Sequence, residues 1–205
     1  MKRTLLFVLL GIVIGYAFSY LKPQQKPLQR AKETTGIENY FPVKEGSFWE
    51  YKGTKKEQQV DGKIETSEID KRVEVNSVTT ETEANTLSIT NDGQAEKWLI
   101  SGNSIDFEPD EPQDKFILSF PLYIGQKWGD EIQLRNRDDG YYTWEVEQKL
   151  PQEVLGKKYN DCFRIAFKTL SGTSYKIFCY GIGVVEEGYK HNGTILEEVY
   201  KLTAI

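Results

Sequence analysis

The sequence predicts an all-β protein in which antiparallel strands form a barrel, a half-barrel or a sandwich. Three observations favour this fold class. Apolar and polar residues alternate with a period near two from Asn39 onward, turn dipeptides containing glycine separate the alternating runs, and a nine-residue motif occurs twice. The N-terminus is the exception, because its apolar run predicts a helix ahead of the β domain.

The composition of the 205-residue chain excludes several classes of protein. One His and two Cys cannot supply the four ligands of a usual Cys/His zinc site. A formal net charge of −5, with 26 Lys plus Arg against 31 Asp plus Glu, argues against a nucleic-acid binder. An aromatic content of 13% is too high for a disordered chain. The composition therefore favours a folded protein of one or two domains.

Residues 1–22 have the pattern of a signal peptide or a membrane anchor. Lys2 and Arg3 form a positive segment ahead of the uncharged apolar run 5–21. Small residues permit cleavage after Ser19, whereas the length of the run also borders on that of a membrane-spanning helix. Both outcomes stay open, and each places the rest of the chain outside the cytoplasm. If the run is not cleaved, it holds the protein on the cytoplasmic membrane.

Residues 23–38 predict a flexible tether, because they combine Pro, Gln and mixed charges. The cations in residues 1–22 are Lys2, Arg3 and Lys22, so 26 minus 3 leaves 23 cations against 31 anions in the exported part. A balance of −8 does not favour docking on an anionic lipid surface. Any link to the membrane is therefore expected through the N-terminal segment alone.

From residue 39 to residue 205 the chain predicts strands joined by tight turns. β-branched and aromatic residues alternate with polar ones in such runs, which fit a pleated, half-buried surface. The clearest runs are residues 68–75, 86–90, 96–100, 141–146 and 163–167. Glycine-containing turns separate them at residues 61–62, 91–93, 101–103, 138–140, 171–172 and 192–193. No window after the N-terminal run shows a helical period.

A repeated motif predicts two tandem copies. Residues 41–49 (FPVKEGSFW) and 120–128 (FPLYIGQKW) share the pattern Phe-Pro-aliphatic-x-x-Gly-x-x-Trp. Proline begins a strand, glycine permits the turn, and tryptophan buries a large ring in the next strand. We expect one β domain, residues 39–205, built from copies at residues 39–115 and 116–205.

The tryptophans are the candidate ligand-binding residues. The plain interpretation of the motif is that it only shapes the fold. The sharper hypothesis is that Trp49 and Trp128 line an apolar cleft shared by the two copies, with Trp144 as a further candidate.

The motifs resemble those of a group of small secreted or membrane-tethered bacterial proteins. Such chains open with Tyr-Phe-Pro-Leu-Lys-x-Gly-x-x-Trp-x-Tyr, repeat Phe-Pro-Leu-x-x-Gly-x-x-Trp, and close with Gly-x-Gly-x-Val-x-Glu. The corresponding segments here are residues 40–51, 120–128 and 181–187, and the resemblance spans about residues 39–200. It implies a β-rich exported fold without an established activity. The apolar run lacks the lipobox cysteine of the lipid-anchored members, which puts lipid anchoring in doubt.

Cys162 and Cys179 flank a predicted hairpin. The sum of their numbers is odd, so an even-length turn places both side chains on the same face. They lie directly opposite if the turn centres on Leu170-Ser171, and diagonally if it centres on Ser171-Gly172. Outside the cytoplasm this geometry predicts a structural disulfide, and the alternative is two thiols on one face.

No catalytic residue, cofactor or metal ligand is predicted. His191 fits a turn, and the glycines at 181 and 183 lack the third glycine and the helix of a dinucleotide site. The acidic segment 106–114 favours a solvated loop over a calcium site, which stays open. Glu145 fits a solvated strand position, opposite in face to Trp144.

These observations favour an exported, non-enzymatic envelope protein that binds a partner or an apolar ligand. The partner is an unidentified envelope protein, lipid or glycan. A carbohydrate-binding module is the first alternative, through Tyr141, Tyr142 and Trp144 if their rings are exposed. The second is a hydrolase whose acid pair the sequence does not single out.

Overall fold

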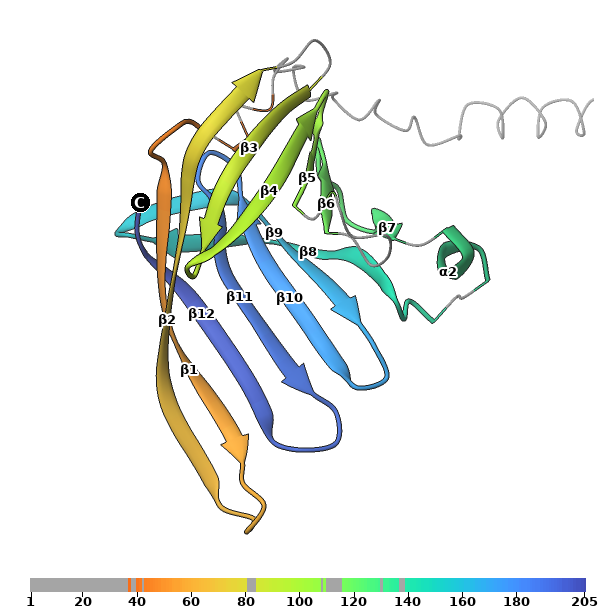
Figure 1. Ribbon diagram of the computed structural model, residues 1–205. Helices are drawn as coiled ribbons and strands as arrows, with labels where there is room; N and C mark the ends of the chain where they lie inside the picture. The colour runs from red at the N-terminus through yellow and green to blue at the C-terminus, as the bar shows by residue number, and fades with distance from the viewer. Residues whose placement is uncertain are drawn as a thin grey trace, which may run out of the picture. The chain divides into compact units, whose positions relative to one another are not determined.

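A single antiparallel sheet of twelve strands forms the β domain (Figure 1). The computed structural model describes residues 37, 40–41, 43–80, 84–107, 109, 116–129, 131–136 and 139–205. The predicted N-terminal helix, the predicted signal or anchor and almost all of the predicted tether lie outside the described residues. The all-β fold class is confirmed.

The strands follow one another along the sheet in chain order, with one exception. The sheet order is β6-β5-β4-β3-β2-β1-β12-β11-β10-β9-β8-β7, so the first strand pairs with the last. The bounds are β1 (Phe48–Gln58), β2 (Ile64–Thr80), β3 (Ala84–Asn91), β4 (Gln94–Ser101), β5 (Ser104–Asp106), β6 (Ile117–Ser119), β7 (Lys127–Gly129), β8 (Thr143–Val154), β9 (Lys157–Lys168), β10 (Gly172–Cys179), β11 (Gly183–His191) and β12 (Leu196–Ala204).

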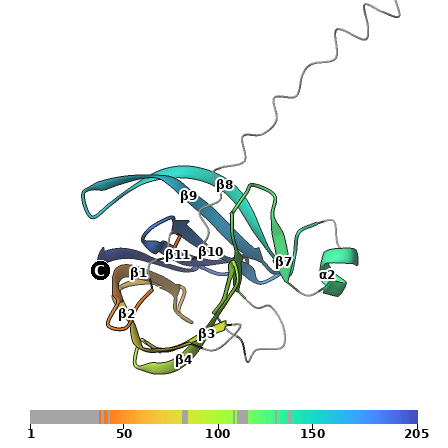
Figure 2. The same cartoon turned by 90° about the horizontal axis from the view of Figure 1, so that it is seen from above.

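The sheet curls into a nearly closed barrel. Figure 2 shows it turning from β4 through β1 to β8, and the two edge strands are β6 and β7. Strands β1 to β6 form one side of the barrel and strands β7 to β12 form the other, and β1 and β12 join the two sides through eight residue pairs. Of the three predicted architectures, barrel, half-barrel and sandwich, the structure is therefore nearest to the barrel.

The two Phe-Pro motifs form the same turn. Gly46 and Gly125 have φ values of +79° and +85°, a region that favours glycine. Their N–H groups donate to the carbonyl oxygens of Val75 and Val146, at 2.9 and 2.8 Å. The N–H groups of Val75 and Val146 in turn donate to the carbonyl oxygens of Ser47 and Gln126, at 2.8 and 2.9 Å. The turn leads into β1 in the first motif and into β7 in the second.

The motif tryptophans have different surroundings. Trp49 is 4% exposed, and its Nε1 donates to the carbonyl oxygen of Ile182 at 2.8 Å. Trp128 is half-buried on an edge strand, and its Nε1 has no hydrogen-bond partner among the described residues. The difference follows from strand position, because β1 has a neighbour on each side whereas β7 pairs only with β8.

One short helix was not predicted. Helix α2 (Glu131–Asn136) follows β7, and six residues are too few to show an amphipathic period. Within the described residues, no helix has the length and apolar character needed to cross a bilayer.

The Gly-x-Gly segment 181–183 brings the chain close to an aromatic ring. A Cβ on Gly183 would lie 2.2 Å from Cε2 of Phe41, so the ring occupies the space that a side chain would need. Phe41 in turn stacks on Trp49, with ring centroids 5.1 Å apart.

Cys162 and Cys179 form a disulfide. Thr173 pairs with Lys168 in the register of β9 and β10, so the hairpin centres on Leu170-Ser171 and the two cysteines face each other directly. The first of the two predicted registers is the one that the structure has.

Candidate functional site

The curled sheet encloses a cavity of about 300 Å³. Strands from both sides of the barrel line it, because its residues come from β1 to β4 and from β8, β10 and β11, apart from Phe41, Phe107 and Phe116, which lie between strands or ahead of β1. Six aromatic side chains form what we call the aromatic floor: Phe41, Trp49, Trp98, Phe107, Phe116 and Trp144. A volume of this size lies at the lower end of the range for small-molecule sites.

The rings of the aromatic floor contact one another across the barrel. The centroids of Trp98 and Phe107 are 4.7 Å apart, those of Phe107 and Phe116 are 4.8 Å apart, and those of Phe116 and Trp144 are 4.6 Å apart. Offset and tilted pairs at these distances are favourable by about 0.5–1.5 kcal/mol each. The floor is therefore a continuous apolar surface from β4 to β8.

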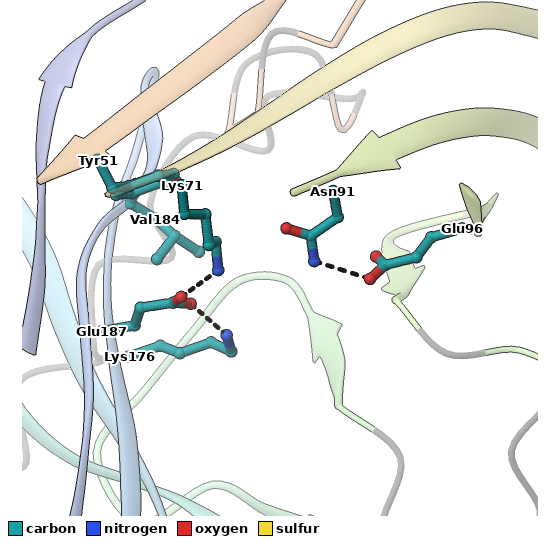
Figure 3. Close-up of polar contacts among 7 residues, drawn as sticks. All are labelled: Tyr51, Lys71, Asn91, Glu96, Lys176, Val184 and Glu187. Atoms are coloured by element: carbon teal, nitrogen blue, oxygen red, sulfur yellow. Dashed lines mark hydrogen bonds and ion pairs between the residues drawn. The ribbon is translucent and has the colours of Figure 1, made fainter. Parts of the chain in front are cut away.

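A lysine cluster of Lys71, Lys176 and Glu187 lies on one side of the cavity (Figure 3). Lys176 Nζ donates to Glu187 Oε2 at 2.6 Å, and Lys71 Nζ donates to Oε1 of the same carboxylate. The three residues come from β2, β10 and β11, so the contact of Lys71 with Glu187 joins the two sides of the barrel. With two ammonium groups and one carboxylate, the cluster carries a net charge of +1.

Glu187 is ionised although its side chain is only 14% exposed. Burial alone raises its pKa, but the charges and hydrogen bonds of Lys176 and Lys71 outweigh burial and hold the pKa at about 2. Burial, and then the charge of Glu187, raise the pKa of Tyr51 well above its usual value. Tyr51 is thus a neutral donor, and its hydroxyl donates to the carbonyl oxygen of Val184 at 2.9 Å.

A second polar group, the Asn91–Glu96 pair, lies apart from the lysine cluster in Figure 3. Asn91 Nδ2 donates to Glu96 Oε1 at 2.7 Å. This bond orients the amide, and Asn91 Oδ1 is left buried without a hydrogen-bond donor in the part of the chain that the structure describes. A buried acceptor without a partner is costly, by about 1–3 kcal/mol.

A smaller cavity of about 170 Å³ continues the site along the inner face. It shares Trp144, Ser174, Lys176 and Glu187 with the larger cavity. Its other lining residues lie on three adjacent strands: Tyr175 on β10, Gly188 and Tyr189 on β11, and Glu198 and Tyr200 on β12. The two cavities therefore adjoin each other at these four shared residues.

The structure brings together two of the three candidate tryptophans. Trp49 and Trp144 line the larger cavity, whereas Trp128 is not among its lining residues. Trp144 is 7% exposed, and Tyr141 and Tyr142 are half-buried. These three rings do not form an exposed aromatic platform of the kind that the carbohydrate alternative requires.

Sequence reasoning missed Trp98 and the lysine cluster. Trp98 lies in the alternating run 96–100, and this alternation is the signal that indicates its inward-facing position. Lys71 stands between Ile69 and Val73 on one face of β2, and a lone charge on such a face was the available signal. Its partners on β10 and β11 could not be inferred, because more than a hundred residues of sequence separate each of them from Lys71.

The remaining singled-out residues have structural contacts. His191 Nδ1 accepts hydrogen bonds from the N–H groups of Gly193 and Thr194, both at 3.1 Å, and so shapes the β11–β12 turn. Glu145 lies 3.5 Å from Lys127 Nζ. No group of three His, Cys, Asp or Glu side chains within the described ranges could hold a metal ion, and most of segment 106–114 lies outside those ranges.

Comparison with known proteins finds two solved structures that align with this chain at low sequence identity. No family model and no curated protein sequence matches the chain. A candidate lipoprotein from Parabacteroides distasonis ATCC 8503 aligns over 82% of this chain and 97% of its own, with 14% identity and a TM-score of 0.41. A candidate exported protein with a YmcC-like fold from Bacteroides fragilis NCTC 9343 aligns over 80% and 96%, with 13% identity and a TM-score of 0.40.

Proposed function

We propose that this chain is an exported, non-enzymatic envelope protein that binds a small amphipathic ligand inside the open barrel. The apolar part of the ligand lies on the aromatic floor, and its polar end lies at the charged side chains above the floor. The observation that carries the proposal is the position of six contacting rings in a cavity that also presents lysine, glutamate and asparagine side chains.

The size of the cavity favours a small ligand over a protein partner. About 300 Å³ accommodates one ring system or a short acyl chain. Transfer of apolar surface from water to the floor is favourable by about 25 cal/mol per Å². The polar side chains fix orientation, because each already has a defined partner or position before the ligand enters.

Hydrolysis is the less favoured activity of this cavity. Glu96 and Glu187 are the two carboxylates that line it. A general acid needs a raised pKa so that it carries a proton at neutral pH. The two lysines hold the pKa of Glu187 at about 2, so this carboxyl has no proton to donate.

Export is proposed from the N-terminal sequence and the disulfide. Residues 1–22 have a signal-like pattern, and disulfides persist in oxidising compartments. Mass measurement of the protein from fractionated cells distinguishes the cleaved form from the uncleaved, anchored form. The mass of a chain that starts after Ser19 indicates cleavage. The mass of the full-length chain in the membrane fraction indicates anchoring. Full-length protein in the cytosol contradicts export.

The cavity proposal is tested by titrating the full chain with anilinonaphthalene sulfonate, an aromatic anion whose fluorescence rises in apolar sites. Ser174 lines both cavities, so Ser174→Phe fills the space between them. Thr173→Phe is the matched control, because neighbouring strand residues face opposite sides of the sheet. We expect saturable binding that Ser174→Phe weakens about tenfold or more and Thr173→Phe leaves within about twofold.

Two results contradict the cavity proposal. One is the absence of saturable binding to the unmodified chain. The other is equal binding by the Ser174→Phe and Thr173→Phe variants, provided that both have the circular dichroism spectrum of the folded protein.

A further inference from the structure

We infer that the polar end of the ligand is zwitterionic, with its anionic group at the lysine cluster and its ammonium group at the Asn91–Glu96 pair. This inference rests on the proposed function and specifies the class of ligand. The class is an apolar α-amino acid or another small molecule that carries an amine and an acid group next to an apolar chain.

The lysine cluster has an excess of positive charge and of hydrogen-bond donors. Each lysine ammonium has three N–H groups, and one of each is directed at Glu187. Lys71 and Lys176 also lie over aromatic rings, with Lys71 Nζ 5.5 Å from the ring centroid of Tyr51 and Lys176 Nζ 5.3 Å from that of Phe116. A ligand anion above the aromatic floor can therefore contact two ammonium groups.

The Asn91–Glu96 pair has the opposite character. Asn91 is neutral, so its hydrogen bond leaves the negative charge of Glu96 in place, and no described lysine or arginine forms an ion pair with Glu96. Asn91 Oδ1 is a second acceptor, buried and lacking a donor within the described residues. An ammonium group supplies three N–H donors, and thus fits a site with a carboxylate and an amide oxygen.

The two polar groups stand apart across one cavity. Figure 3 shows Lys71, Lys176 and Glu187 together on one side and the Asn91–Glu96 pair on the other. Both groups line the cavity whose floor is aromatic. A ligand with only one charge satisfies only one of them and leaves the other facing an apolar chain. A zwitterionic end with an apolar substituent satisfies both groups and the floor.

Four ligands with related chains test the inference: octanol, octanoate, octylammonium and α-aminooctanoate. Binding of each to the full-length protein is measured by isothermal titration calorimetry. We expect α-aminooctanoate to bind about tenfold tighter than octanoate and octylammonium, because each charge-assisted hydrogen bond adds roughly one order of magnitude. Octanol is expected to bind most weakly.

Two variants assign the charges to their sites. Glu96→Gln is expected to weaken α-aminooctanoate binding about tenfold and to leave octanoate binding within about twofold. Lys176→Gln is expected to weaken octanoate and α-aminooctanoate binding and to spare octylammonium. Glu68→Gln is the matched control for Glu96→Gln, because Glu68 is exposed and is not a lining residue of the cavity. It should change none of the affinities.

The outcomes separate this inference from the proposed function. Equal affinity for octanol, octanoate and α-aminooctanoate contradicts a zwitterionic end and leaves the cavity proposal intact. No binding of any of the four contradicts the cavity proposal itself. Loss of octanoate binding in Glu96→Gln also contradicts the assignment.

A lipid headgroup can supply the same chemistry as a free amino acid. Dihexanoyl phosphatidylethanolamine, below its micelle concentration, is therefore titrated beside α-aminooctanoate. Tighter binding of the phospholipid identifies a lipid ligand, and tighter binding of α-aminooctanoate identifies an amino acid. If neither binds more tightly than octanoate, the inference is wrong.

Discussion

Glu187 contacts lysine side chains from the two sides of the barrel, and its ionisation contributes to the stability of the folded protein. Its pKa is about 2 in the folded protein against an ordinary value of 4.5. A folded-state pKa below the unfolded value contributes stability above pH 4.5, and this stability is lost as the pH falls from about 4.5 to about 2. The lysine cluster is thus expected to weaken in acid.

The first prediction concerns Glu187→Gln. At neutral pH this change leaves two poorly exposed ammonium groups without their carboxylate, so we expect a loss of roughly 3 kcal/mol in the free energy of unfolding. The loss should shrink as the pH falls from 4.5 towards 2, where the wild-type carboxyl also becomes protonated. Urea unfolding at several pH values measures it, with Glu68→Gln as the exposed control. A loss that does not change with pH contradicts the assigned pKa.

For single residues, the repeated motif predicts the backbone turn but not the burial of the side chain. The recurrence of glycine predicted a turn, and Gly46 and Gly125 do form the same turn with the same hydrogen bonds. The recurrence of tryptophan did not predict common surroundings, because the burial of an indole depends on which strands lie beside it. Trp49 and Trp128 differ for that reason.

At the scale of secondary structure elements, the β9–β10 hairpin carries the one covalent cross-link. The Cys162–Cys179 disulfide closes a loop with a sequence separation of 17 residues. In the chain-entropy model, a loop of this length contributes about 3 kcal/mol by restricting the unfolded chain. The second prediction is that the double variant Cys162→Ala and Cys179→Ala unfolds with a free energy lower by about that amount. Equal stability of the double variant and the oxidised wild type in urea would contradict it.

The third prediction compares the strands that follow the two motifs. Trp49→Phe removes the donor to the buried Ile182 carbonyl and leaves a gap in the core, so we expect a loss of roughly 2–4 kcal/mol. Trp128→Phe removes an N–H that has no partner within the described part of the chain, so we expect a loss below about 1 kcal/mol. Thermal or urea unfolding of both variants measures the difference. Similar losses would show that the two indoles have equivalent environments.

Period-two alternation identified long strands and missed short elements. The runs at residues 68–75, 86–90, 96–100 and 163–167 lie within β2, β3, β4 and β9. Strands β5, β6 and β7 have three residues each, and α2 has six. So few residues contain at most one or two repeats of any period, and for these elements tertiary contacts decide the structure.

For the whole molecule, the pairing of β1 with β12 creates the site. This pairing joins strands at opposite ends of the chain, and it brings Lys71 within bonding distance of Glu187. The aromatic floor likewise runs from Trp98 on β4 to Trp144 on β8. Alternation indicated which of these side chains face inward, but only the curl of the complete sheet determines which ones meet. The fold class and an apolar cleft at Trp49 and Trp144 were therefore predictable from the sequence, whereas the charged side chains that meet in the cavity were not.

The most direct test of the ligand site uses ω-bromooctanoate, because bromine quenches nearby indole fluorescence. The chain has four tryptophans, and three of them, Trp49, Trp98 and Trp144, line the cavity. Titration of the full chain should give saturable quenching that Trp98→Phe reduces and Trp128→Phe leaves in place. Quenching that does not saturate, or that disappears only in Trp128→Phe, would contradict a ligand site on the aromatic floor.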